Sequence, residues 1–203
     1  MPTNNKLIKP LDSVLDWASF KRGDLKSFES LYRIFSGALY NYGSKFSTDK
    51  DLVKDCIQDL FVNIWARRES LGNPKNVKNY LFKAFRLSLF KKLNYFKSQV
   101  TYEEIEEYSF EAILNREDQI IKNEGNERLQ EQLQLILNEL TAKQREIVFL
   151  KFYENLSYDE IAEIMEVSVK ATYKMMARAM EAMREKLENV DFYLLIMIVG
   201  KII

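Results

Sequence analysis

Residues 140–187 constrain the fold of this chain more than any other stretch, because they carry two strong helix-start signals. Thr141 is followed three residues later by Gln144, and Ser157 is followed three residues later by Glu160. In this capping pattern a hydroxyl residue opens a helix and an amide or acid three residues on bonds back to it. We therefore expect helices to begin directly after Thr141 and Ser157.

A third helix is predicted after Ser168, beyond a turn at Glu166-Val167. Its apolar positions recur at steps of three and four, which is typical of one buried stripe: Thr172, Met176, Ala179, Met183 and Leu187. Another face carries a row of cations: Lys170, Lys174 and Arg178. A helix with this division suits the major groove of duplex DNA. An ordinary helical bundle remains open, because many such turns carry Gly where this chain has Glu166.

Composition excludes several classes of protein. The 203 residues carry 30 basic and 30 acidic side chains, so a uniformly basic nucleic-acid binder is excluded and DNA contacts must come from local patches. The absence of His removes the commonest metal ligand and general base, and Cys56 alone forms neither an intramolecular disulfide nor a cysteine zinc site. We expect Cys56 to be buried, and no catalytic residue, metal or cofactor. Few Gly and Pro, and no signal-peptide pattern, predict an all-α cytoplasmic protein.

Two helices are predicted before residue 70. The first follows Asp24 and has one apolar face: Leu25, Phe28, Leu31, Tyr32, Phe35, Leu39 and Tyr42. The second runs from about Asp49 to Arg68, with a wide apolar stripe opposite a polar face: Asp51, Asp55, Gln58, Asp59 and Asn63. This polar face is either simply solvated or a docking surface for a partner.

An unusual helix follows the break at residues 72–74 and runs from Lys75 or Val77 to about Phe96. No acidic residue occurs between Ser70 and Tyr102, and cations alternate there with aromatic rings. That combination suits single-stranded nucleic acid, because cations follow the phosphates and rings stack on bases. We assign to the core Tyr80, Phe82, Phe85 and Leu89. The expected contact residues are Lys83, Arg86, Lys91, Lys92, Asn94 and Tyr95.

The charge reverses in the next segment, which predicts a domain boundary. We divide the chain into a domain at 1–97, an acidic linker at 98–125, a second domain at 126–191 and an apolar tail at 192–203. The linker keeps itself extended and soluble by its charge, or competes with DNA for the basic surfaces. The tail is too short to span a bilayer, so we expect it to cap an apolar surface or bind a partner, without stable membrane insertion.

Residues 24–97 and 140–187 together resemble a bacterial RNA polymerase sigma factor of the extracytoplasmic-function group within the sigma-70 family. The resemblance rests on an ordered set of segments: DLVKDCIQDLFVNIWARRESL, YLFKAFRLSLFKKL and LSYDEIAEIMEVSVKATYKMMARAMEAMREKL. It implies an all-α fold of two small helical domains, the second a winged-helix-like four-helix module with a helix-turn-helix. The implied function is promoter-specific transcription initiation with core RNA polymerase.

The resemblance also implies roles for individual residues. Contact with the coiled coil of the polymerase β′ subunit falls to Asp55, Gln58, Asp59 and Asn63. The −10 element falls to Lys83, Arg86, Lys91, Lys92, Asn94 and Tyr95. The −35 element falls to Ser168, Val169, Lys170, Tyr173, Lys174, Arg178 and Arg184. In the −10 helix, Leu87 and Lys91 differ from the family pattern, which predicts an altered −10 preference. Val169 and Ala171 read few bases, so DNA shape and phosphates carry more of the −35 contact.

The implied partners are core RNA polymerase, promoter DNA and an anti-sigma factor, with no small-molecule substrate. Two alternatives stay open. A helix-turn-helix regulator with an unrelated helical domain explains residues 140–187, but neither the acid-free aromatic helix nor the acidic docking face. A helical decoy that docks polymerase without starting transcription is compatible with the departures at Leu87 and Lys91.

Overall fold

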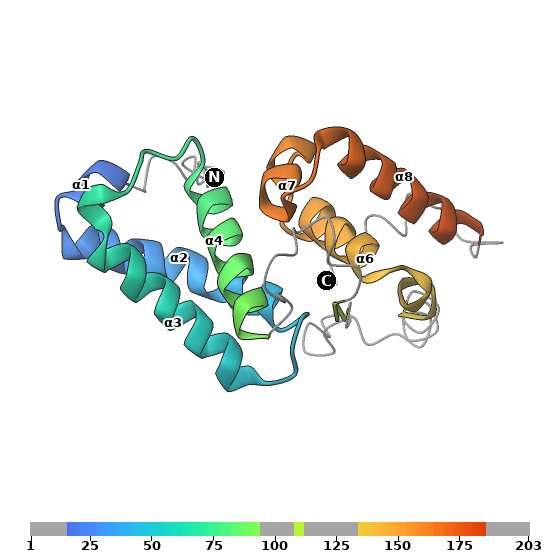
Figure 1. The fold of residues 1–203 in the computed structure, drawn as a ribbon, viewed down its shortest axis with the longest axis horizontal. Helices are drawn as coiled ribbons and strands as arrows, with labels where there is room; N and C mark the ends of the chain where they lie inside the picture. The colour runs from blue at the N-terminus through green and yellow to red at the C-terminus, as the bar shows by residue number, and fades with distance from the viewer. Residues whose placement is uncertain (1–15, 94–107, 112–133, 186–203) are drawn as a thin grey trace, which may run out of the picture.

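The computed structural model describes residues 16–93, 108–111 and 134–185 of the chain. All regular secondary structure in these residues is helical, and they contain no strand, so the all-α prediction is confirmed. Figure 1 shows two groups of helices side by side, α1 to α4 from the N-terminal half and α6 to α8 from the C-terminal half. The predicted tail at 192–203 and most of the predicted linker lie outside the described residues.

The N-terminal group consists of α1 (Trp17–Lys21), α2 (Leu25–Gly43), α3 (Lys50–Ala66), the 3-10 turn η2 (Arg68–Ser70) and α4 (Val77–Lys92). Each α-helix begins after a short polar residue whose side chain accepts a hydrogen bond from a first-turn backbone N–H: Asp16, Asp24, Asp49 and Asn76. Such caps satisfy amides that have no partner inside the helix. Helices α2, α3 and α4 pack against one another around buried aromatic and aliphatic side chains.

The C-terminal group consists of α6 (Ala142–Val148), the π-helical segment η5 (Phe149–Tyr153), α7 (Tyr158–Met165) and α8 (Val169–Glu185). Both predicted capping boxes are present, Thr141 with Gln144 and Ser157 with Glu160. Residues 134–139, before α6, are also helical. The predicted helix-turn-helix is therefore α7 and α8, and the turn between them positions α8 across α6 and α7.

The turn between α7 and α8 contains a residue in a backbone conformation that residues other than glycine rarely adopt. Glu166 ends α7 in the left-handed region at φ 54°, where glycine is usual. Ser168 then caps α8, because its Oγ accepts a hydrogen bond from the Ala171 backbone N–H at 3.1 Å. The predicted stripe of α8 is buried at Thr172, Met176, Ala179 and Met183, while Leu187 lies outside the described residues.

Two residues of the predicted apolar face of α2 lie outside the buried core. Leu25 and Tyr32 are 61% and 48% exposed, although both fit the helical periodicity of the apolar face. Leu25 is the first residue of α2. Tyr32 lies at the edge of the core, where its ring packs edge-on against the ring of Phe61, with the ring centroids 4.9 Å apart. The assignment of Phe82, Phe85 and Leu89 to the core is confirmed, whereas Tyr80 is only partly buried and packs against the core.

The two groups of helices share a single continuous core. Helix α4 packs against α7, and Tyr42 of α2 stacks on Phe149 of η5 with ring centroids 5.9 Å apart. Residues 108–111, from the predicted linker, contribute Tyr108 and Phe110 to this core; both are buried. Part of the linker therefore joins the two domains by packing between them. None of the helices in the described residues has the length and apolarity needed to span a membrane.

Candidate nucleic-acid and polymerase interfaces

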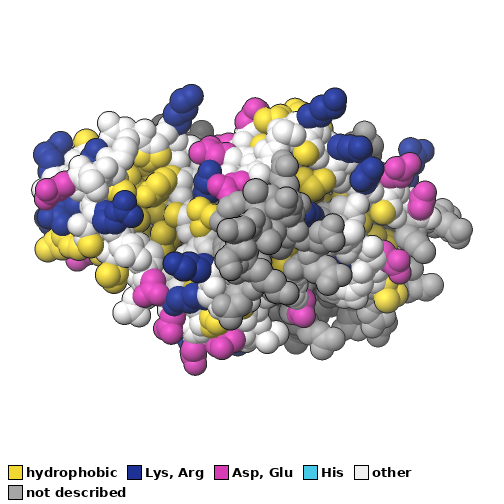
Figure 2. Space-filling model, viewed as in Figure 1, with side chains coloured by type: hydrophobic (Ala, Val, Ile, Leu, Met, Phe, Trp, Pro, Cys, Tyr) yellow, Lys and Arg dark blue, Asp and Glu magenta, His cyan; other side chains and the backbone are white. Residues whose placement is uncertain are grey.

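Helix α8 presents its cations outward. Figure 2 shows Lys and Arg side chains following the α8 side of the molecule. All seven residues expected at the −35 element are exposed: Ser168, Val169, Lys170, Tyr173, Lys174, Arg178 and Arg184. The buried stripe and the cationic row thus lie on different faces of one helix. This arrangement leaves the row accessible to duplex DNA without any rearrangement of the fold.

An aromatic pair connects the two helices of the helix-turn-helix. The ring centroids of Tyr158 at the start of α7 and Tyr173 on α8 are 4.2 Å apart. The Lys151 ammonium lies 4.8 Å from the Tyr158 ring centroid, within the range of a cation–π contact. Tyr173 is nevertheless 55% exposed. Its ring is therefore oriented by Tyr158 while its outer side remains open.

The polar face of α3 is accessible as expected. Asp55, Gln58, Asp59 and Asn63 are all exposed, and Val62 beside them is 58% exposed. Asp59 forms an ion pair with Lys92 of α4 at 2.7 Å. The hydrogen bond from Lys92 to Asp59 raises the pKa of Lys92. One residue expected at the polymerase is therefore paired with one expected at the −10 strand.

The cations of α4 lie in different environments. Lys91 and Lys92 are exposed near its C-terminal end, as a strand-binding surface requires, and Asn94 and Tyr95 lie outside the described residues. Lys83 is half-buried and forms an ion pair with Glu166 at 3.0 Å. Arg86 is only 3% exposed. The expectation that Arg86 is open for contact is therefore wrong for this conformation, because the C-terminal group of helices covers it.

Arg86 is covered by a buried cluster centred on Glu146 of α6. Its Nε and Nη2 donate hydrogen bonds to the two oxygens of Glu146 at 2.7 and 3.2 Å. The hydroxyls of Tyr42 and Tyr108 donate to the same carboxylate. Glu146 is 0% exposed, so a carboxylate from one domain is held by donors from α2, α4 and the linker.

Protonation states in this cluster follow from burial and charge. Burial raises the pKa of Tyr42 and Tyr108 well above the usual range of a phenol, and the charge of Glu146 raises both further. Both hydroxyls therefore stay protonated and act as donors. Burial alone would lower the pKa of the Arg86 guanidinium, but the Glu146 carboxylate raises it, so Arg86 stays charged. The cluster is a buried ion pair with its hydrogen bonds largely provided.

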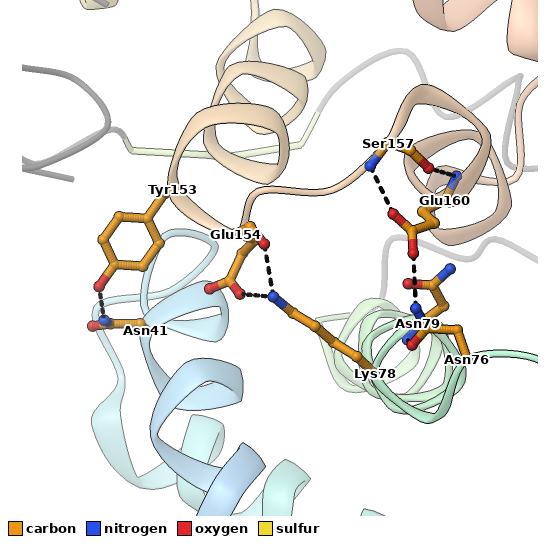
Figure 3. A network of polar contacts seen from close by, with 8 residues as sticks. All are labelled: Asn41, Asn76, Lys78, Asn79, Tyr153, Glu154, Ser157 and Glu160. Atoms are coloured by element: carbon orange, nitrogen blue, oxygen red, sulfur yellow. Dashed lines mark hydrogen bonds and ion pairs between the residues drawn. The ribbon is translucent and has the colours of Figure 1, made fainter. Parts of the chain in front are cut away.

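Polar contacts continue along α4 (Figure 3). Lys78 Nζ contacts Glu154 twice, at 2.8 Å to Oε2 and 2.7 Å to the backbone carbonyl. Asn76 Nδ2 donates to Glu160 Oε1 at 2.7 Å, while Ser157 completes the capping box on the other side of that carboxylate. Glu160 of the capping box that starts α7 therefore also contacts the N-cap residue of α4.

The pKa values of Glu154 and Glu160 are shifted in opposite directions. Burial raises the pKa of Glu154, and Lys78 offsets this only in part. Burial also acts to raise the pKa of Glu160, but hydrogen bonds from Ser157, Asn76 and Asn79 lower it below its usual value. The ionised form is therefore favoured at Glu160 and disfavoured at Glu154.

Sequence reasoning missed the residues that join the two domains. Glu146, Glu154 and Tyr108 were not expected to have any role. Glu146 carries the one available signal, since it is an acid immediately before the apolar run Ile147 to Leu150. An acid at the edge of a buried stripe requires a partner. The identity of that partner, 60 residues away, is not visible in the pattern.

Comparison with known proteins extends these observations. The profile of the family described as "Sigma-70, region 4" matches residues 130–183, which include α6, α7 and most of α8. Over 159 residues the chain is 22% identical to the ECF RNA polymerase sigma factor SigM of Bacillus subtilis, covering 78% of this chain and 93% of SigM. Along most of its length the chain is therefore similar to extracytoplasmic-function sigma factors. RNA polymerase sigma factor NccH of Alcaligenes xylosoxydans xylosoxydans is 24% identical to the chain, and the match covers 78% of the chain and 85% of NccH.

Solved structures share the fold of this chain. CnrH, in a complex with the cytosolic domain of CnrY, superposes with a TM-score of 0.57 at 19% identity, covering 85% of this chain and 94% of the other. RpoE of Bartonella quintana, in a complex with the anti-sigma factor NepR, gives 0.58 at 23% identity, covering 82% and 99%. The matches extend well beyond the helix-turn-helix, so a regulator with an unrelated helical domain is not supported.

Proposed function

We propose that this chain is an extracytoplasmic-function sigma factor that uses three separate surfaces to direct core RNA polymerase to promoters. The exposed polar face of α3 binds the β′ coiled coil, the cationic face of α8 binds the −35 duplex, and α4 binds the opened −10 strand. The observation that carries the proposal is that the α3 face and the α8 row are both exposed, on different helices of one chain. Polymerase and duplex DNA can therefore be held at the same time.

The proposed surfaces make different kinds of contact with the promoter. Phosphate contacts by Lys170, Lys174 and Arg178 set the register on duplex DNA, since such contacts position a protein without reading sequence. The few base contacts fall to Val169 and Tyr173, whose apolar surface fits the methyl group of thymine, and DNA shape carries more of the specificity. On α4, pocketed bases and cations offset the few kcal/mol needed to unpair and unstack the strand.

Two further features belong to the proposal. The chain works in the cytoplasm as an initiation factor and makes or breaks no bond itself, so any catalysis is that of the polymerase. The domain limits are 1–97 and 126–191, with the linker at 98–125 and the tail at 192–203. Limited proteolysis that cuts first within 98–125 and 192–203 would support these limits.

An inhibitor protein is the remaining proposed partner. The two structural relatives were solved in complexes, one with the cytosolic domain of CnrY and one with the anti-sigma factor NepR. We expect a protein of this kind to bind the present chain and to be recovered with it from its own host cells under non-inducing conditions. Recovery of the chain with no such protein under those conditions would count against this partner.

Run-off transcription with purified core polymerase and a pool of genomic templates tests the function. The wild-type chain should produce discrete transcripts that are absent with core polymerase alone. A variant with Asp55→Lys and Gln58→Ala should lose them and should fail to retain polymerase in a pull-down. Glu163→Lys, a change of an exposed acid on α7, is the matched control and should retain both activities. No transcript from any template with the wild-type chain would contradict the proposal.

A further inference from the structure

Tyr173 of α8 is an exposed aromatic residue among cations. In the part of the chain that the structure describes, Tyr173 and Tyr32 are the two aromatic residues that are exposed rather than half-buried or buried. Lys170 lies three residues before Tyr173, and Lys174 follows it directly. A single exposed ring is common on a protein surface. What distinguishes Tyr173 is that side chains from outside α8 fix the position of its ring.

Two side chains support this ring from α7 and η5. Tyr158, the first residue of α7, lies against Tyr173 with the ring centroids 4.2 Å apart and the ring planes inclined by 37°. Lys151 Nζ lies 4.8 Å from the Tyr158 ring centroid and donates a hydrogen bond to the Leu156 carbonyl oxygen at 3.0 Å. Tyr158 and Lys151 are both half-buried. We call Lys151 and Tyr158 the ring support.

Tyr173 lies where a recognition helix contacts bases. It is close to the start of α8 (Val169–Glu185), and the N-terminal residues of such a helix are those that reach base edges in the major groove. Val169, four residues earlier on the same face of the helix, is 37% exposed. These two side chains provide apolar surface beside the cations of α8. Apolar surface of this kind contacts the methyl group of thymine.

A ring that is already fixed distinguishes bases better than a mobile ring. Ordering a mobile side chain on binding weakens affinity by about two- to ten-fold, and a ring held before binding avoids this loss. A ring that can rotate away also loses its contact with a methyl group, whereas the phosphate contacts of neighbouring cations are kept. The ring support should therefore affect base preference more than overall affinity.

We propose that Tyr158, supported by Lys151, is a positioning residue for the −35 element. It sets the orientation of the Tyr173 ring, and through that ring the preference for thymine at one base pair. The identity of the DNA element rests on the proposed function, whereas the orientation of the ring rests on the contacts alone. If the two rings only joined α7 to α8, removal of Tyr158 would lower stability and leave base preference unchanged.

The first measurement uses the free full-length chain without DNA. 3-Fluorotyrosine replaces Tyr173, and its fluorine NMR resonance is recorded. In the wild-type background this resonance should be displaced from that of free fluorotyrosine, because the Tyr158 ring lies 4.2 Å away. Tyr158→Phe keeps a second ring and should keep the displacement, whereas Tyr158→Leu keeps apolar bulk and should remove it. Equal resonances in the wild-type and Tyr158→Leu backgrounds would overturn the proposal.

The second measurement uses the chain bound to core polymerase and a promoter duplex recovered by run-off transcription. Each thymine of the −35 element is replaced in turn by uracil, which lacks the methyl group and keeps the base pair. The wild type should bind one of these duplexes about four-fold more weakly, as expected for one buried methyl group. Tyr173→Ala and Tyr158→Leu should bind the thymine and uracil duplexes about equally. Tyr158→Phe should keep the wild-type ratio, and Lys151→Met should give an intermediate ratio.

Two controls separate base reading from general damage. Glu163→Gln changes an exposed acid of α7 outside the ring support and should keep the wild-type ratio. The salt dependence of affinity reports the phosphate contacts, and it should be the same for Tyr158→Leu and the wild type. A Tyr158→Leu variant that kept the wild-type thymine-to-uracil ratio would overturn the proposal, as would a wild-type ratio of one at every thymine. Failure of the wild type with polymerase to bind any promoter specifically would instead contradict the proposed function.

Discussion

Helices α4 and α8 have similar sequence features, but their cationic side chains lie in different environments. Both begin after a polar N-cap residue and both carry a row of cations beside a buried apolar stripe. On α8 the cations are exposed, whereas on α4 Arg86 is buried and Lys78 and Lys83 are paired with carboxylates from the other domain. The comparison teaches that the availability of a cation depends on which distant segment packs over it.

The largest expected effect is on the free energy of unfolding, which should fall when the Arg of α4 is replaced but not when an Arg of α8 is replaced. Arg86→Met removes the guanidinium that pairs with buried Glu146, which should lower the free energy of unfolding by about 3–5 kcal/mol. Arg178→Met on α8 should change it by less than about 0.5 kcal/mol, because the side chain is exposed. Urea unfolding of both variants measures the difference. Equal midpoints would show that the Arg86 contact does not hold the domains together.

A second comparison tests how firmly α4 is fixed on its inner side. A Cβ added at Gly43 of α2 would lie 2.7 Å from Phe85 of α4 and 2.7 Å from Val53. Gly43→Ala should therefore lower the free energy of unfolding by about 1–3 kcal/mol through overpacking.

Gly37 is the matched control, since it lies in the same helix and a Cβ there meets nothing within 4 Å. Gly37→Ala should raise stability by about 0.5–1 kcal/mol, because alanine favours the helix interior. Thermal unfolding of both variants gives the comparison. A tolerated Gly43→Ala would mean that α4 packs less tightly than the structure shows.

The exposed row of α8 predicts an effect on DNA binding rather than on stability. With core polymerase bound, Lys170→Ala and Lys174→Ala should each reduce the salt dependence of promoter affinity, by about 0.9 in the slope of log K against log salt per lost phosphate contact. Glu163→Gln on α7 serves as the control and should leave the slope unchanged. Filter binding over a range of salt concentrations provides the slopes. Unchanged slopes in both Lys variants would remove α8 from the DNA interface.

The smallest expected effect concerns Glu160 and Glu154, whose pKa values are shifted in opposite directions. The pKa of Glu160 lies below its usual 4.5, so its stabilising contribution is present above pH 4.5 and is lost as the pH falls through the lowered value. The pKa of Glu154 is raised above 4.5, so its contribution is present below pH 4.5 and is lost as the pH rises through the raised value.

Glutamine variants make this difference measurable. At neutral pH, Glu160→Gln should be less stable than the wild type and Glu154→Gln should be at least as stable, and both differences should fade below about pH 4.5. Urea unfolding between about pH 4 and pH 7 provides the test. Parallel pH profiles for the two variants would contradict the opposite environments of these residues.

Local features of the fold were predictable from the sequence, because local chemistry determines them. Asp24 and Asp49 and both capping boxes begin helices where expected, and Ser168 caps α8. The division of α8 into buried and exposed faces follows from helical periodicity alone. The accessible polar face of α3 was predictable for the same reason.

Contacts between the domains were not predictable in this way. Arg86 and Glu146 are 60 residues apart, and Asn76 and Glu160 are 84 apart. Helical periodicity places Arg86 on a face of α4 but does not show which segment covers that face. The segment around Tyr108 looked like a charged linker, because its two buried aromatic residues stand among glutamates. The assignments of residues to polymerase and DNA remain predictions.

Lysine modification of the full chain, read by mass spectrometry, tests the difference between α4 and α8 most directly. In the free chain, Lys170 and Lys174 should be acetylated rapidly, and Lys78 and Lys83 slowly, because their side chains are only 23% and 35% exposed and are paired with carboxylates. Addition of core polymerase and promoter DNA should protect Lys170 and Lys174 from acetylation. Equal rates for all four lysines in the free chain would contradict the account.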